Sequence, residues 1–138
     1  MYEKYDCIVI GGGPGGFVGV IRAAQFVFKT ACIEKRINKQ GKPALGGTCL
    51  NVGCIPSKAL LHSSELFEET SHLDRLGIIV GEAKLDLPAM MSHKDTIGSE
   101  LTAGAEFLFK NNKNTGIKGT AKILSPGTAE VVLHNRAN

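Results

Sequence analysis

The sequence predicts an α/β fold in which a parallel sheet is flanked by helices and followed by a β-hairpin. Two apolar runs rich in β-branched residues, 5–10 and 29–34, are typical of buried parallel strands, and a helical pattern over 17–26 separates them. Two further strand-like runs, 117–124 and 129–133, flank a turn at 125–128. Strands that alternate with helices indicate a parallel sheet, and the chain length suits one domain spanning 1–138.

Composition and charge exclude several classes of partner. Hydrophobic residues make up 43% and charged residues 21% of the chain, as in ordinary globular proteins. The net charge of +3 is spread thinly, without a basic run interleaved with aromatics, so we expect no nucleic-acid partner. The apolar runs are too short to cross a membrane, and no signal peptide is recognisable. We therefore expect a cytoplasmic protein without a membrane partner.

A glycine-rich loop, Gly11 to Gly16, follows the first strand directly. Gly11, Gly13 and Gly16 fit the pattern G-x-G-x-x-G, with Pro14 and Gly15 between them. The first glycine allows a tight turn, the second lets backbone approach a pyrophosphate, and the third permits close helix packing. The pattern alone is weak, but here it lies between a strand and a helix. This context predicts a Rossmann-like dinucleotide-binding unit.

The second predicted strand ends in an acidic residue, Glu34, near the roughly 20-residue spacing expected of a ribose-binding carboxylate. We therefore predict that Glu34 binds ribose rather than serving only as a solvated acid. Lys35 and Arg36 raise the alternative of a 2′-phosphate site, although Glu34 would repel that phosphate. The polar, turn-rich segment 37–44 is expected to be a loop without chemistry.

The four cysteines divide into two kinds. Cys7 and Cys32 lie within apolar strand-like runs, where we expect small buried hydrophobic side chains. Cys49 and Cys54 have four residues between them and stand at the predicted start of a helix, with Pro56 suited to its first turn. A helix N-terminus favours a thiolate, so this second pair suits redox chemistry.

Two alternatives for the second cysteine pair fit the sequence less well. A structural zinc site needs four ligands, and no second Cys or His pair is suitably spaced, so we expect no metal. His62 stands alone on the predicted helix and is expected to be partly exposed. Two plain buried thiols are hard to reconcile with the glycines and polar Asn51 nearby. We therefore interpret the pair as a redox couple.

The region beyond the cysteine helix is expected to support packing. The segment 73–84 is expected to be a connection without a site. Asp86 is a candidate cap for a long helix with Pro88 in its first turn. An apolar stripe along that helix is predicted to face the core; it consists of Met90, Ile97, Leu101 and Leu108.

The glycine loop, Glu34 and the run Gly46–Lys58 together resemble the flavin disulfide reductase family. The resemblance implies FAD, with Gly13–Gly16 at its pyrophosphate and Glu34 on its adenosine ribose. It implies that Cys49 exchanges with a dithiol substrate and that Cys54 contacts the flavin. Further cofactor-binding positions carried over by the resemblance are Gly11, Lys35, Gly47, Thr48, Lys58 near the flavin, and Thr120 and Ala121 near the adenine.

Within the family, the run Leu50–Lys58 most resembles the branch that oxidises dihydrolipoamide. This implies a homodimer in which two electrons pass from dihydrolipoamide on lipoylated acyltransferase subunits of 2-oxoacid dehydrogenase complexes, through the disulfide and FAD, to NAD. It also implies a part in cell redox homeostasis. The alternatives are a reductase of the glutathione or mercuric type, and a non-catalytic fragment that only binds flavin.

The chain departs from the family pattern in two details and in extent. Ala121 and Val27 stand where family members often have glycine. The resemblance covers about the first third of a family member. We therefore expect the strands that complete the FAD domain, the NAD-binding domain and the dimer-interface domain with its acid–base histidine to be absent. On that expectation the fragment alone is inactive.

Overall fold

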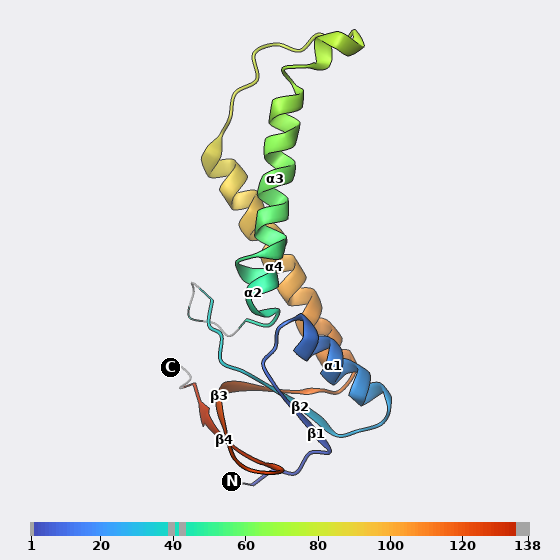
Figure 1. The fold of residues 1–138 in the computed structure, drawn as a ribbon, viewed down its shortest axis with the longest axis vertical. Helices are drawn as coiled ribbons and strands as arrows, with labels where there is room; N and C mark the ends of the chain where they lie inside the picture. The colour runs from blue at the N-terminus through green and yellow to red at the C-terminus, as the bar shows by residue number, and fades with distance from the viewer. Residues whose placement is uncertain (1, 39–40, 42–43, 135–138) are drawn as a thin grey trace.

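The computed structural model describes residues 2–38, 41 and 44–134. The chain forms a small mixed sheet with helices beside it and a long helical projection (Figure 1). In chain order the elements are β1 (Cys7–Ile10), α1 (Pro14–Gln25), β2 (Thr30–Glu34), α2 (Gly47–Asn51), α3 (Cys54–Glu69), the 3₁₀ helix η1 (Leu73–Leu76), α4 (Leu87–Asn111), β3 (Thr115–Ser125) and β4 (Thr128–Leu133).

The sheet has the order β1-β2-β3-β4. β1 pairs with β2 and β2 with β3 in parallel, and β3 pairs with β4 antiparallel. The first residues of β3 lie beside β2, whereas its remainder forms the hairpin with β4. The predicted α/β class, parallel strands and C-terminal hairpin are therefore confirmed.

The core lies where α1 and α4 meet over β2. Val20 of α1, Cys32 of β2 and Phe109 of α4 form its buried centre, against which Leu45 and other half-buried side chains pack. Burial raises the pKa of the Cys32 thiol to about 11. Cys32 is thus the small buried hydrophobe expected from the sequence, and Cys7 on β1 is half-buried.

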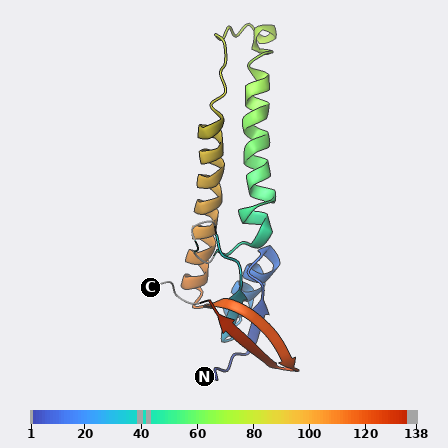
Figure 2. The ribbon, with the colours of Figure 1, turned by 90° about the vertical axis from the view of Figure 1, so that its left-hand side faces the viewer.

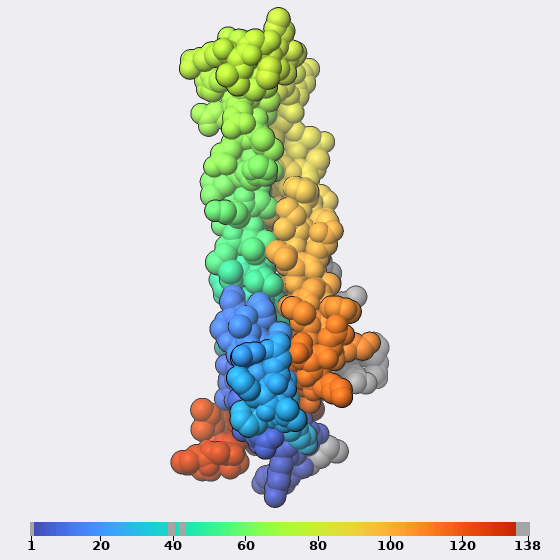
Figure 3. All heavy atoms as spheres, turned by 90° about the vertical axis from the view of Figure 1, so that its right-hand side faces the viewer, coloured from blue at the N-terminus to red at the C-terminus, as the bar shows by residue number. Residues whose placement is uncertain are grey.

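A helical projection extends away from the sheet. Helices α3 and α4 lie side by side and antiparallel, with η1 and a coil joining their far ends (Figure 2). We call residues 54–97 the arm and the other described residues the body. The space-filling view shows the arm as a narrow column on the wider body (Figure 3). Every side chain classed as buried belongs to the body.

Several sequence expectations for this half of the chain are confirmed. Asp86 caps α4 because its Oδ1 accepts a hydrogen bond from the Ala89 N–H at 3.0 Å, and Pro88 lies in the first turn. The segment 73–84 is a short 3₁₀ turn followed by coil. Of the expected loop 37–44, residues 39, 40, 42 and 43 lie outside the described residues.

The start of helix α1 and the buried face of helix α4 differ from expectation. Helix α1 begins at Pro14 rather than Phe17, because proline fits a first helical turn. The predicted core stripe of α4 is wrong in its second half, since Leu101 and Leu108 are 44% and 46% exposed. The side chains that α4 buries there are Ala105 and Phe109. The buried face rotates because α4 leaves its neighbour α3 and meets the sheet and α1 instead.

In the part of the chain that the structure describes, no helix combines the length and apolar character required to cross a membrane.

Candidate functional site

The glycine loop makes a turn between β1 and α1 that only glycine fits at one position. A Cβ on Gly16 would lie 1.8 Å from the carbonyl oxygen of Gly11, far inside van der Waals contact. Gly13 is the N-cap of α1, and no side chain among the described residues caps this end. The unpaired N–H groups of the first turn and the positive end of the helix dipole therefore face outward together.

Glu34, at the end of β2, braces this loop. Its Oε2 accepts a hydrogen bond from the Gly12 N–H at 2.6 Å, and its Oε1 accepts one from the Arg36 N–H at 2.7 Å. A carboxylate offers about four acceptor sites, so both oxygens keep capacity for ribose hydroxyls. Gly12 was not among the sequence-predicted site residues, although it lies inside the predicted motif.

The segment that follows residue 44 lies directly against the glycine loop. The Gly46 N–H donates to the Gly12 carbonyl at 2.7 Å. Gly47 has a φ of 56°, and a Cβ there would lie 2.8 Å from the Gly13 Cα. This close approach therefore requires glycine at position 47. The fold therefore brings the glycine loop against the cysteine segment, although the two segments are about 30 residues apart along the chain.

Cys49 and Cys54 belong to two different helices that meet end to end. Cys49 lies in the five-residue helix α2, which the sequence did not reveal, and Cys54 is the first residue of α3. The Gly53 N–H donates to the Thr48 carbonyl at 2.8 Å and closes the turn between them. A short helix of this kind gives too few residues for a periodic pattern.

The Cys49 and Cys54 side chains lie close enough to interact. Both cysteines are free, with Cys49 half-buried and Cys54 exposed. A side-chain hydrogen bond with Cys54 raises the pKa of the Cys49 thiol, and desolvation adds to the increase. Cys49 therefore keeps its proton to a higher pH than an unperturbed cysteine does.

Asn51 holds the short helix in place. Its Nδ2 donates to the Leu45 carbonyl at 2.9 Å and to the Gly47 carbonyl at 2.8 Å. Leu50 beside it is buried. Sequence reasoning noted Asn51 only as a polar residue between the cysteines; the signal it offered was an asparagine four residues after Gly47.

Two hollows lie beside these elements. A cavity of about 250 Å³ runs between the end of β2 and the last turns of α4; Glu34, Leu45, Phe109 and Asn114 are among its lining residues. The Asn114 Nδ2 is buried there without a hydrogen-bond partner. A hollow of about 220 Å³ follows α3, lined by Lys58, Leu61, His62 and Glu65.

The remaining predicted residues lie around the same end of the sheet or along the arm. Lys58 and His62 are exposed on α3. The Lys35 carbonyl oxygen lies 2.9 Å from His134 Nε2. Thr120 and Ala121 lie on β3, just beyond Lys118, which pairs with Glu34. In the described ranges, no three His, Cys, Asp or Glu side chains are grouped to hold a metal.

Comparison with known proteins gives a consistent match. The model of the family described as "Pyridine nucleotide-disulphide oxidoreductase" matches residues 5–136. The chain is 54% identical over 130 residues to a mitochondrial dihydrolipoyl dehydrogenase of Pisum sativum, covering 94% of this chain and 25% of that protein. It is 51% identical over 135 residues to dihydrolipoyl dehydrogenase 3 of Pseudomonas aeruginosa, covering 96% and 27%.

A relative named for a different activity matches as well. A leghemoglobin reductase of Glycine max is 51% identical over 130 residues, covering 94% of this chain and 24% of that protein. The chain thus spans about a quarter of the length of the curated relatives it matches.

Proposed function

Because this chain belongs to the pyridine nucleotide-disulphide oxidoreductase family, we propose that it forms the FAD-binding part of a dihydrolipoamide dehydrogenase. The whole protein oxidises protein-bound dihydrolipoamide through a Cys49–Cys54 disulfide and FAD, and NAD receives the hydride. The observation that carries the proposal is the contact of two thiols at the junction of α2 and α3, directly beside a glycine loop that suits a pyrophosphate.

The residues present fit FAD. The first turn of α1 offers unpaired N–H groups to a pyrophosphate. The backbone of Gly13, Pro14 and Gly15 lies at this turn, and nothing among the described residues lies within 4 Å of a Cβ added at Gly15, so a ligand can approach there. Glu34 has acceptor capacity left for the adenosine ribose. The further residues proposed to hold the cofactor are Gly11, Lys35, Gly47, Thr48, Lys58, Thr120 and Ala121. When bound, FAD supplies a two-electron acceptor beside the cysteine pair.

The cysteines perform the exchange with the substrate. In the oxidised pair, a substrate thiolate attacks Cys49 Sγ, which forms a mixed disulfide and releases Cys54 as a thiolate. The second substrate sulfur, as a thiolate, then attacks the substrate sulfur of that mixed disulfide and releases Cys49. The substrate leaves as a disulfide, and its two electrons now reside in the reduced protein pair.

The surroundings of the pair favour distinct roles for its two sulfurs. The hydrogen bond with Cys54 raises the pKa of Cys49, so the Cys49 sulfur holds a proton after release. Cys54 is the first residue of a 16-residue helix and lies at the positive end of its dipole. The two environments differ, and the family resemblance assigns the contact with substrate to Cys49.

The proposed partners are lipoylated acyltransferase subunits of 2-oxoacid dehydrogenase complexes and a second copy of the whole protein. The names of the relatives support the first, because most are dihydrolipoyl dehydrogenases. A cytoplasmic location stays a prediction, because the printed names include mitochondrial proteins of Pisum sativum and Dictyostelium discoideum.

Cysteine substitution in the protein expressed from its complete reading frame tests the proposal. We expect Cys49→Ser and Cys54→Ser each to abolish dihydrolipoamide oxidation by NAD, because neither variant can form the disulfide, while the FAD absorbance persists. Cys7→Ser is the matched control, because Cys7 lies on β1 outside the pair, and it should keep activity.

Turnover retained by either variant would refute the redox assignment. Preferred reduction of glutathione disulfide or mercuric ion by the unmodified protein would place it in another branch of the family. Loss of FAD from the cysteine variants would show that the pair serves binding rather than exchange.

A further inference from the structure

We propose that Asn51 is a positioning residue that sets the ease with which the Cys49–Cys54 disulfide closes. The inference rests on the proposed function, because it concerns the same pair of sulfurs. Its basis is the location of Asn51 between the cysteines and the two hydrogen bonds that its side-chain amide donates to backbone carbonyls.

Helix α2 needs external support to exist. It has five residues, whereas isolated helices shorter than about 12 residues are marginal in water. Its N-cap, Gly46, has no side chain with which to cap the helix. Backbone bonds such as that from the Leu50 N–H to the Gly46 carbonyl hold the turn that contains Cys49, and the two bonds from Asn51 reinforce it.

The bonds also connect α2 to segments that contact the core and the glycine loop. One acceptor is the carbonyl of Leu45, whose side chain packs against the buried core. The other is the carbonyl of Gly47, whose backbone touches the glycine loop. Asn51 thus ties the last residue of α2 to the residues before it, and Cys49 lies within this closed segment.

Cys54 belongs to the next helix, which Asn51 does not contact through a hydrogen bond of its side chain. Cys54 begins α3, and the Ser57 N–H donates to the Gly53 carbonyl at 2.9 Å as that helix starts. A disulfide requires Cβ atoms about 3.5–4.5 Å apart, so its closure depends on how firmly Cys49 is held toward Cys54. Without Asn51, the α2 backbone gains conformations in which the sulfurs do not meet, and closure must remove that freedom.

The redox equilibrium of the pair measures this effect directly. In a dithiothreitol buffer, the S–S bond of oxidised dithiothreitol breaks while the Cys49–Cys54 bond forms. Two electrons and two thiol protons pass from the protein to the reagent. The equilibrium constant can be read by alkylation and mass spectrometry of the purified protein from its complete reading frame, without any turnover assay.

We expect Asn51→Ala to make the disulfide about tenfold easier to reduce, which corresponds to about 30 mV. Asn51→Ser should give a smaller shift, because a serine hydroxyl can still donate to the carbonyl four residues before it, that of Gly47, but is too short for Leu45. Asn112→Ala is the matched control: the Asn112 Nδ2 donates a single bond of 2.9 Å to the Leu108 carbonyl, far along α4 from the cysteines, and its loss should leave the equilibrium unchanged.

An equilibrium constant within twofold of the unmodified protein in both Asn51 variants would overturn the proposal. An equal shift in Asn112→Ala would also overturn it, because a general loss of stability would then explain the effect. If Asn51→Ala fails to fold, the serine variant decides the matter alone. A pair that forms no disulfide in the unmodified protein would defeat the proposed function itself, whereas a normal disulfide indifferent to Asn51 would defeat only this inference.

Discussion

The body and the arm of the molecule are held together in different ways. The body buries apolar side chains from α1, β2 and α4, including Val20, Cys32 and Phe109. The arm contains no buried side chain, and large apolar residues at its far end, such as Leu76 and Ile79, are 74% and 94% exposed. The body is therefore stabilised by a core, whereas the arm depends on one helix lying along another.

The total surface reflects this difference. The chain exposes 10165 Å², whereas a compact monomer of 14.7 kDa exposes about 6,900 Å². Two helices side by side in solvent leave most of their circumference uncovered, and the arm has this geometry (Figure 2).

The cysteine pair lies on the boundary between the two regions. Cys49 belongs to the body through α2, and Cys54 is the first residue of the arm. A disulfide between them would join the region with a core to the region without one. The comparison thus teaches that the proposed redox site lies at the boundary between the region with a buried core and the helix that begins the region without one.

The largest expected effect comes from a pair of phenylalanines. Phe109 is 5% exposed in the body, whereas Phe67 is 41% exposed on α3 in the arm. Phe109→Ala should lower the free energy of unfolding by about 3–5 kcal/mol, because it leaves a cavity in the core. Phe67→Ala should cost less than about 1 kcal/mol. Urea unfolding of the purified variants measures both.

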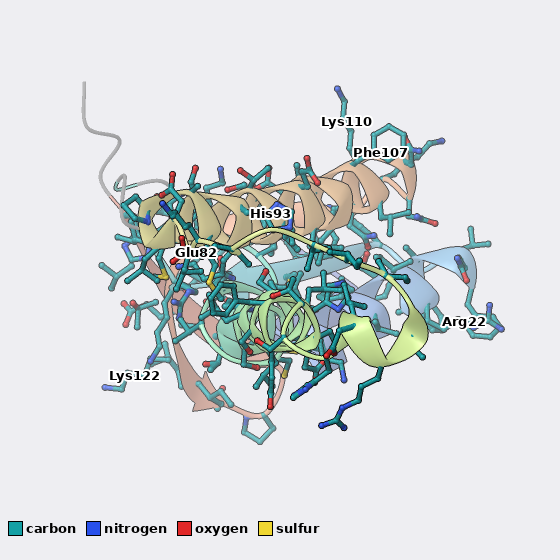
Figure 4. All side chains as sticks on the ribbon, turned by 90° about the horizontal axis from the view of Figure 1, so that it is seen from above. Arg22, Glu82, His93, Phe107, Lys110 and Lys122 are labelled. Atoms are coloured by element: carbon teal, nitrogen blue, oxygen red, sulfur yellow. The ribbon has the colours of Figure 1, made fainter. Side chains whose placement is uncertain are left out.

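A third phenylalanine provides the control. Phe107 lies on the same helix as Phe109 but projects into solvent, 61% exposed (Figure 4). Phe107→Ala should change the free energy of unfolding by about 0.5 kcal/mol at most. Equal losses for Phe109 and Phe67 would show that the arm is as well packed as the body, which would end the distinction.

A smaller effect is expected from a glycine of the loop. A Cβ on Gly16 would overlap the Gly11 carbonyl, so Gly16→Ala must displace the backbone turn between β1 and α1. We expect a loss of about 3 kcal/mol in the free energy of unfolding. Gly19→Ala in the same helix is the control; nothing lies within 4 Å of its added Cβ, and it should be neutral or stabilise by up to about 1 kcal/mol. Equal behaviour of the two variants would show that the turn tolerates a side chain.

The sequence predicted those elements, in the body and in the arm, that are specified by local patterns. The strands β1 and β2, the glycine loop and the hairpin follow from local patterns of apolar and turn residues, and all were confirmed. The start of α3 at the second cysteine was also predicted, because Pro56 marks a first turn. Pro88 and the Asp86 cap likewise located the start of α4.

The rest depended on contacts between distant segments. Helix α2 was not predicted, because it is stabilised by Asn51 and by contact with the glycine loop and its sequence is too short to show a helical period. The buried face of α4 was predicted wrongly, because the helix packs against different elements along its length. Leu101 and Leu108 continue the apolar stripe of its first half but lie on a face that no other element of the described chain covers. No local pattern reports where a helix stops touching one neighbour and begins touching another.

The smallest expected effect concerns strain at a helix end in the body. Val27 has a φ of 68°, which is unfavourable for a β-branched residue. The bonds Val27 N–H to Ala24 O at 2.9 Å and Phe28 N–H to Ala23 O at 3.4 Å form the Schellman arrangement, whose left-handed position favours glycine. In the arm, Thr70 ends α3 at a φ of −56°, without such strain.

Val27→Gly should therefore stabilise the protein by about 0.5–1 kcal/mol, the relief of left-handed strain less the extra chain entropy of glycine. Lys113 ends α4 in the same arrangement at a φ of 55°, and Lys113→Gly is the matched control. It should give a smaller gain, because lysine is not branched at Cβ. Urea midpoints measured side by side test the order, and a gain at Lys113 that equals or exceeds the gain at Val27 would show that β-branching is not the source of the strain. A gain at Val27 alone would show that the strain at these two helix ends arises from branching at Cβ rather than from the positive φ by itself.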